Sequence, residues 1–153
     1  MAKVFLDSGV FMQGISARWG AAKAILILGA SGVFSVETSE VVIFEIEAAL
    51  TRNGISTGPG SEFARLVKEL KLVVHPRPSE AAVRDGMSKY SPIVRHKADI
   101  PAVVAAVSTS PDWLVSSDTE HFNAKLALKI GLRIVPPPQL LRYLQLTETV
   151  RKP

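Results

Sequence analysis

The chain has 153 residues, the length of one ordinary domain, and its 47% apolar and 21% charged residues exclude wholesale disorder. It contains no cysteine, which excludes disulfides, thiolate zinc sites and a cysteine nucleophile, and makes a reducing cytoplasm the expected location. A net charge of +4 suits a polyanionic partner without identifying one. The longest apolar run, over residues 24–36, is too short to span a bilayer.

Strand-like and helical segments alternate along the chain. The predicted strands lie at residues 3–6, 33–36, 72–75, 113–116 and 132–135. The predicted helices lie at residues 8–29 (with breaks at Gly14 and Gly20), 39–52, 61–70, 79–90, 99–109, 124–130 and 139–146. This alternation predicts a three-layer α/β/α fold with a mostly parallel sheet of about five strands. We expect a single domain over residues 1–146 and a frayed tail at 147–153.

Acidic residues follow two of the predicted strands. Asp7 and Ser8 come directly after the first strand, and Ser117 and Asp118 after the fourth. Ligands of parallel sheets lie outside the carboxyl ends of the strands, so both acids are candidates for a site. Each also has a purely structural interpretation, because an acid at this position is often only a helix N-cap. For Asp118 that interpretation is strengthened by Glu120, which would complete a capping box.

Two further acids belong to predicted helices. Glu45 lies on the apolar arc of the helix over 39–52, whereas Glu47 lies on its polar arc and is expected to be solvated. A carboxylate on the buried face needs a cation, a proton or a partner, and a salt bridge to Arg or Lys is the alternative to a functional role. Asp99 opens the helix over 99–109, with Pro101 in the first turn, and could be a plain N-cap.

Four segments together resemble the PIN-domain family, the nucleases that include the VapC-like toxins. In chain order they are VFLDS at 4–8, SEVVIFEI at 39–46, KAD at 97–99 and WLVSSDTEHF at 113–122. The resemblance covers residues 3–135, with the segments in the family's order. It implies that divalent metal is held by Asp7, Glu45, Asp99 and Asp118.

The same resemblance implies supporting roles near the acids. Ser8 matches the small hydroxyl after the first Asp, Ser117 the hydroxyl before the last, and Glu120 a further acid of some relatives. Gly9 departs from the pattern, because relatives often carry Asn or Ser there. A supporting contact is therefore either missing or supplied by Ser8.

The predicted ligands suit Mg²⁺ or Mn²⁺. These ions prefer hard oxygen ligands and need neither His nor Cys. An ion would also resolve the like-charge repulsion between clustered carboxylates, and it can lower the pKa of bound water and neutralise phosphate oxygens. Basic side chains around such a pocket would hold flanking phosphates, the candidates being Arg52, Arg95 and Lys97.

These features predict a cytoplasmic ribonuclease that hydrolyses RNA phosphodiester bonds with Mg²⁺ or Mn²⁺. The resemblance also implies the role of toxin in a toxin–antitoxin pair, with an antitoxin protein as partner, and a homodimer. The alternative is a PIN-like module that binds RNA or a protein without turnover. A phosphoacceptor receiver domain fits less well, because it needs an acidic acceptor after a middle strand and the third strand ends in His75 and Pro76. His121 is expected to pack or hydrogen-bond beside Phe122.

Overall fold

The structure is a computed structural model that describes residues 1–151, with side chains described through Gln145. Its strands are β1 (Lys3–Leu6), β2 (Ser35–Ser39), β3 (Val73–His75), β4 (Trp113–Val115) and β5 (Ile134–Val135). Its helices are α1 (Ser8–Ser16), α2 (Ala21–Ala30), α3 (Glu40–Arg52), α4 (Glu62–Glu69), α5 (Glu80–Tyr90), the 3₁₀ helix η1 (Lys97–Asp99), α6 (Ile100–Thr109), α7 (Ala124–Ile130) and α8 (Pro137–Arg151).

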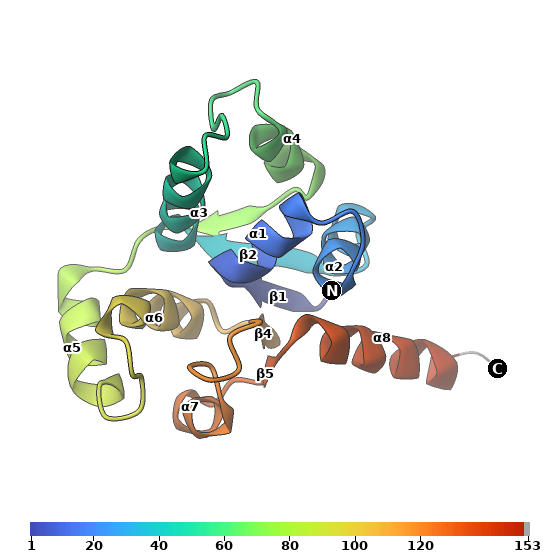
Figure 1. Ribbon diagram of the computed structural model, residues 1–153. Coiled ribbons are helices and arrows are strands. Elements are labelled where there is room, and N and C mark those ends of the chain that lie inside the picture. Colours follow the sequence, from blue (N-terminus) through green and yellow to red (C-terminus); the bar gives the residue numbers. More distant parts are fainter. Residues whose placement is uncertain (152–153) are drawn as a thin grey trace.

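The five strands form one sheet in the order β3-β2-β1-β4-β5, and every pair is parallel. Helices cover both faces, with α1, α2 and α4 on one side and α5, α6 and α7 on the other (Figure 1). The predicted three-layer α/β/α fold is confirmed, and the sheet is entirely parallel. The chain leaves β1 towards β2 and later returns to β4 on the other side of β1. The strand order therefore reverses between β1 and β4, which is where such sheets bind ligands.

The core lies on both faces of the central strand. Val4, Phe5 and Leu6 of β1 are all buried, as expected for a strand covered on both sides. One helix contact depends on a missing side chain: a Cβ on Gly86 of α5 would come within 2.3 Å of Val104 Cγ2 in α6. Gly86 is therefore needed for the close approach of these two helices.

The predicted strand at 33–36 was placed too early. β2 runs over Ser35–Ser39 and carries polar residues into the sheet, among them Glu37, of which only 3% is exposed. Glu37 is held by a partner on the neighbouring strand, because its Oε1 lies 2.6 Å from Nε2 of His75. Apolar patterning alone does not predict β2, since its buried acid is made tolerable by a hydrogen-bonding partner that is distant in sequence.

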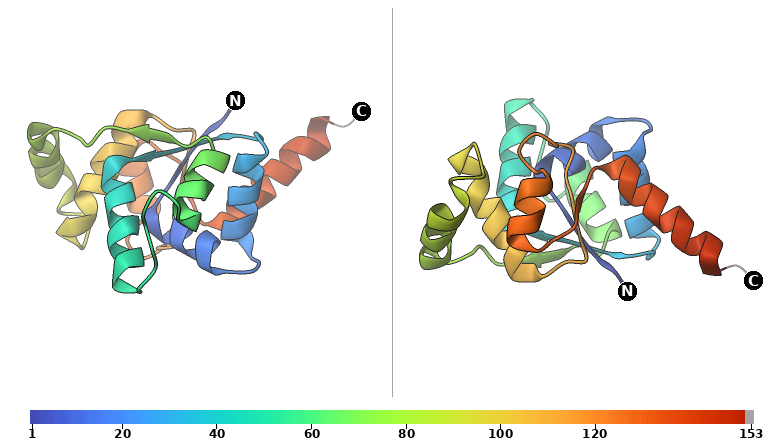
Figure 2. Two further views of the ribbon diagram at one scale, coloured as in Figure 1. Left: turned by 90° about the horizontal axis from the view of Figure 1, so that it is seen from above. Right: turned by 90° about the horizontal axis from the view of Figure 1, so that it is seen from below.

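Helix boundaries differ from the prediction at two places. The break predicted at Gly20 is confirmed, and its φ of 123° is one that no other residue type adopts easily. The break predicted at Gly14 is wrong, because α1 continues through it to Ser16. The helix predicted to end at 146 continues as α8 to Arg151 and extends from one side of the molecule (Figure 2). Residues 152–153 of the expected tail lie outside the described residues. In the described part of the chain, no helix is both long and apolar enough to cross a membrane.

Candidate active site

Asp7 is fixed where β1 passes into α1. Its Oδ1 accepts a hydrogen bond of 2.9 Å from the Val10 backbone N–H, so it is the N-cap of α1 as the structural interpretation predicted. Its other oxygen, Oδ2, accepts a hydrogen bond from the Ser116 hydroxyl. The strand register causes this contact: Leu6 pairs with Val115, which brings the next residue of each strand side by side. The capping role thus leaves Asp7 at the edge where the strand order reverses.

Ser116 was not singled out by the sequence analysis as a site residue. Only 1% of it is exposed, and its hydroxyl both donates to Asp7 and accepts a 3.1 Å hydrogen bond from the Asp118 backbone N–H. Ser117, the hydroxyl that the resemblance favoured, donates instead to Oε1 of Gln13 at 2.7 Å. The signal that could have found Ser116 is its position directly after the last residue of β4, level with Asp7 after β1.

Glu45 and Asp99 approach the same edge from two helices. Glu45 of α3 is half-buried and lines the same pocket as Ser8. The alternative prediction of a salt bridge to Arg or Lys is wrong, because no such pair involves Glu45 in the described part of the chain. Asp99 precedes α6 but makes no side-chain capping bond. Its carboxylate is therefore not committed to the helix that it opens.

Asp118 begins a tight turn. Its Oδ1 accepts a 3.2 Å hydrogen bond from the His121 backbone N–H, and its Oδ2 lies 2.5 Å from His121 Nδ1. The expected capping box does not form, because α7 begins only at Ala124 and is capped by Asn123. The His121 ring also lies against the His96 ring, with centroids 4.5 Å apart. His121 thus hydrogen-bonds as predicted, and its partner is Asp118.

All four predicted acids line one pocket of about 350 Å³. Four elements or their ends contribute them: the β1–α1 junction, α3, η1 and the turn after β4. Among the described residues, no Lys or Arg forms an ion pair with any of the four. The remaining lining residues are Ser8, Gly9, Gln13, Ala102, Ser117 and Phe122. Carboxylates distant in sequence thus share a space that holds no basic side chain.

The carboxylates influence one another's protonation. Burial raises the pKa of Asp7, the hydrogen bonds from Ser116 and Val10 oppose the rise, and the charges of Asp118 and Asp99 add to it. Burial likewise raises the pKa of Glu45, opposed by Ser8 and increased by the charges of Asp99 and Asp7.

Asp118 shifts in the opposite direction. Burial alone would raise its pKa, but the hydrogen bonds and charge of His121 outweigh that effect and lower it. The hydrogen bond to Asp118 in turn raises the pKa of His121. The pocket therefore combines two acids that hold their protons more tightly than usual with one that releases its proton more readily.

The donor set fits a hard divalent cation in chemistry and location. Carboxylate, hydroxyl and amide oxygens line the pocket, and Mg²⁺ and Mn²⁺ prefer such ligands. Among the described residues, no three acidic or histidine side chains already stand in the arrangement of a metal site. An ion would therefore have to draw the carboxylates together, and His121 would compete with it for Asp118.

Of the predicted supporting residues, Ser8 and Ser117 line this pocket, whereas Glu120 and the three predicted phosphate contacts do not. Arg95 and Glu120 form an exposed ion pair of 2.9 Å with each other, which occupies both side chains. Arg52 is the exposed last residue of α3, and Lys97 is exposed in η1, two residues before Asp99. The roles assigned to these residues stay predictions.

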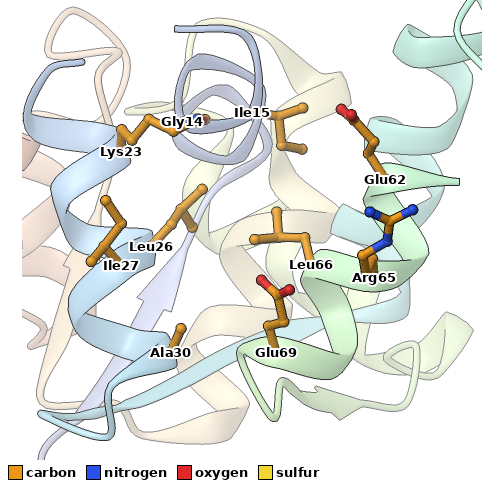
Figure 3. Close-up of a pocket in the computed structure, with 10 residues that line it drawn as sticks. All are labelled: Gly14, Ile15, Lys23, Leu26, Ile27, Ala30, Glu62, Arg65, Leu66 and Glu69. Atoms are coloured by element: carbon orange, nitrogen blue, oxygen red, sulfur yellow. The ribbon is translucent and has the colours of Figure 1, made fainter. Parts of the chain in front are cut away.

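A separate hollow of about 290 Å³ lies between α1, α2 and α4 (Figure 3). Leu26 and Leu66 contribute apolar surface to it, and Lys23, Glu62 and Arg65 contribute charges of both signs. It shares no residue with the acidic pocket. This hollow is therefore not part of the candidate active site.

Comparison with known proteins supports the fold and leaves the chemistry open. No family model and no curated protein sequence matches the chain. The structure is similar to a chain in the crystal structure of VapBC2 from Rickettsia felis bound to a DNA fragment from their promoter. The TM-score is 0.58 at 12% sequence identity, over 88% of this chain and 98% of that one. At this identity the similarity shows the PIN-like α/β/α fold alone.

Proposed function

We propose that this chain is a ribonuclease that hydrolyses RNA phosphodiester bonds with Mg²⁺ or Mn²⁺. The observation that carries the proposal is that Asp7, Glu45, Asp99 and Asp118 line one pocket and that none of them pairs with a Lys or Arg among the described residues. Buried like charges are costly unless a cation offsets them. A bound divalent ion would activate water and neutralise phosphate oxygens in the pocket.

The chain's own residues would prepare the pocket for such an ion. Ser116 and the Val10 backbone N–H hold the two oxygens of Asp7. These hydrogen bonds fix the direction of the Asp7 carboxylate, because a ligand held by a second group has fewer orientations available. Lys97 lies two residues before Asp99 and would attract a phosphate flanking the cleaved bond.

The proposal includes the role of toxin in a toxin–antitoxin pair, with RNA as substrate, an antitoxin protein as partner, assembly as a homodimer and a cytoplasmic location. It is supported by the resemblance of four sequence segments to VapC-like toxins and by the structural similarity to a chain of the VapBC2 complex. Co-expression with the product of a neighbouring small open reading frame tests the pairing: a cognate antitoxin would copurify with this chain and suppress its RNA cleavage.

The central test compares two glutamates on the same helix. Glu45 lines the acidic pocket, whereas Glu47 is exposed. We expect Glu45→Gln, Asp7→Asn and Asp118→Asn each to reduce Mn²⁺-dependent RNA cleavage about 100-fold or more, since several kcal/mol of transition-state stabilisation are lost. Glu47→Gln should cleave like the wild type. Cleavage that survives a chelator, or that is equal in all variants, would contradict the proposal. RNA binding with neither cleavage nor Mn²⁺ binding would favour the non-catalytic module.

A further inference from the structure

A hollow of about 610 Å³ lies beside β5, an edge strand of the sheet, between α7 and α8 (Figure 1). Its apolar lining includes Leu128, which is 87% exposed, and Ile134 of β5, which is partly exposed. Leaving a leucine in water beside a hollow forgoes the stabilisation that its burial would give, so this surface is a candidate for an interaction. It shares no residue with the acidic pocket.

The segment that forms most of this hollow is purely basic. Residues 121–147, which include α7, β5 and the first part of α8, contain four Lys or Arg residues and no acid. The remaining 14 basic and 14 acidic residues of the chain cancel, so the net charge of +4 equals the charge of this segment. The four basic side chains are exposed and form no ion pair among the described residues; they are Lys125, Lys129, Arg133 and Arg142.

Two acids come just before elements that line the hollow, and both have partners elsewhere. Glu120 precedes α7 and forms its ion pair with Arg95. Asp112 precedes β4 and accepts a 2.7 Å hydrogen bond from the Lys3 backbone N–H. The charged residue that lines the hollow is Arg133, and no acid among the described residues lines it. The positive charge of this surface therefore lacks a counterpart in the described part of the chain.

The shape and chemistry of the hollow favour a polypeptide over a nucleic acid. β5 pairs with β4 alone, so its other edge presents backbone groups that an extended peptide can pair with. The two aromatic rings of the lining, Trp113 and Tyr143, lie against each other with centroids 4.9 Å apart, and the Arg133 guanidinium carbon lies 5.0 Å from the Trp113 centroid. These contacts already occupy ring surface on which a base would stack, and the exposed Leu128 offers nothing to a phosphate.

The charges also disfavour a second copy of this chain as the occupant. In a two-fold dimer the same patch faces itself, so the basic side chains of one copy would face those of the other. Like charges brought together cost free energy, whereas the carboxylates of a different partner would be attracted to the same positions.

We propose that the hollow between α7 and α8 binds an acidic peptide segment of another protein. An apolar side chain of the peptide would cover Leu128, and its carboxylates would approach Arg133 and the exposed lysines of α7. The inference is independent of the proposed function, because the hollow and the acidic pocket have no residue in common. Since exposed charges are screened by ions, the affinity should fall as the salt concentration rises.

The test begins with a phage-displayed library of random peptides of about 12 residues, selected against the full chain at about 50 mM salt, where screening of charges is weak. We expect the enriched peptides to combine a net negative charge with at least one large apolar residue. The most enriched peptide, synthesised with a fluorescein label, is then the probe for binding by fluorescence anisotropy.

Variants of the chain test the assigned contacts. Leu128→Ala should weaken binding of the probe about tenfold or more, because most of a leucine side chain is no longer buried in the complex. Arg133→Glu should weaken it about fivefold or more, because one attraction is replaced by a repulsion. Arg18→Glu is the matched control, since Arg18 is exposed, lines neither this hollow nor the acidic pocket, and gives the same change in net charge. It should bind the probe like the wild type, and circular dichroism should show that all three variants fold.

Several results would overturn the inference. These are a selection that enriches no peptide, or only neutral or basic ones; binding unchanged by Leu128→Ala; and an equal loss in Arg133→Glu and Arg18→Glu, which would indicate attraction by net charge alone. Duplex DNA or RNA that binds the wild type but not Leu128→Ala or Arg133→Glu would assign the hollow to a nucleic acid instead. Conversion of a dimer to a monomer by Leu128→Ala, measured by light scattering, would assign it to a second copy.

RNA cleavage by the same variants separates this inference from the proposed function. Leu128→Ala and Arg133→Glu should cleave RNA like the wild type, because neither residue lines the acidic pocket. A wild type that binds the peptide but does not cleave RNA would refute the nuclease and leave the peptide site standing. Mn²⁺-dependent cleavage without peptide binding would do the reverse.

Discussion

Two adjacent serines of identical chemistry occupy different environments, and this difference gives a sharp prediction. Ser116 is buried and joins Asp7 to the Asp118 backbone, whereas Ser117 is partly exposed and bonds a glutamine side chain. Ser116→Ala removes one hydrogen bond to a carboxylate, worth about 1.5–3 kcal/mol, and leaves a backbone N–H without its partner at about 1 kcal/mol. We therefore expect it to lower the free energy of unfolding by about 2.5–4 kcal/mol.

Ser117→Ala is the matched control. Its hydroxyl donates to the neutral side-chain oxygen of Gln13 at an exposed position, where water replaces the lost bond. The expected loss is below about 1 kcal/mol. Urea unfolding with linear extrapolation measures both values, and the corresponding fall in melting temperature is about 5–16 °C for Ser116→Ala.

The pH dependence gives this prediction a second readout. The folded-state pKa of Asp7 is raised above the ordinary 3.8, so the native state keeps this proton to higher pH than the unfolded chain does. The contribution of Asp7 to stability is then fully present below pH 3.8 and is lost as pH rises through the folded-state pKa. The Ser116 hydrogen bond limits that rise, so its removal widens the window. The cost of Ser116→Ala should therefore be larger at pH 7 than at pH 3.5, with EDTA present throughout.

Two results would refute this reasoning. Equal destabilisation by Ser116→Ala and Ser117→Ala would show that the bond to Asp7 contributes nothing to stability. A cost of Ser116→Ala that does not change with pH would show that Ser116 does not affect the ionisation of Asp7.

Three further predictions concern other parts of the molecule. His75→Ala should lower the free energy of unfolding by about 3 kcal/mol, because it leaves Glu37 buried without its partner; a loss below about 1 kcal/mol in urea unfolding would contradict this. Gly86→Ala should cost about 1–3 kcal/mol through its clash with Val104, and Val104→Ala in the same chain should recover part of the loss; a stabilised Gly86→Ala variant would show that α5 and α6 separate freely. Mn²⁺ at about 100 times its dissociation constant should raise the free energy of unfolding of the wild type by about 2.7 kcal/mol but not that of Glu45→Gln at the same concentration, as followed by calorimetry; an equal rise in both would place the ion elsewhere.

The locations of the four acids could be predicted because strand ends are visible in sequence. A parallel sheet brings its carboxyl ends to one edge, so Asp7 and Asp118 were expected there from their positions after apolar runs. The helical periodicity likewise separated Glu45 from Glu47 correctly. These predictions needed only local patterns and one general rule of topology.

The partners of the polar groups could not be predicted in the same way. The pair between Glu37 and His75 joins residues 38 positions apart, and it depends on the register of β2 and β3. Without knowledge of that register, the sequence of β2 is too polar to be predicted as an interior strand. The prediction therefore placed the strand at the more apolar residues 33–36. Ser116 was overlooked for a related reason. The resemblance pointed to Ser117 as the hydroxyl before Asp118, and neighbouring residues of an extended segment point to opposite sides, so Ser116 and not Ser117 faces Asp7.

For each acid, the sequence suggested helix capping and membership of a shared site as alternatives. In the structure the two roles are not exclusive. Asp7 caps α1 with one oxygen and still lines the pocket with its neighbours, so capping and site membership coexist in one carboxylate. Asp99 heads a helix without capping it, so the position alone did not determine the contact. The capping preference of an acid therefore explains why it is placed at a strand end but not why several such acids are left facing one another. Burial, to which the charges of the neighbouring acids add, raises the pKa of Asp7 and Glu45, a cost to folding at neutral pH that a bound cation would offset.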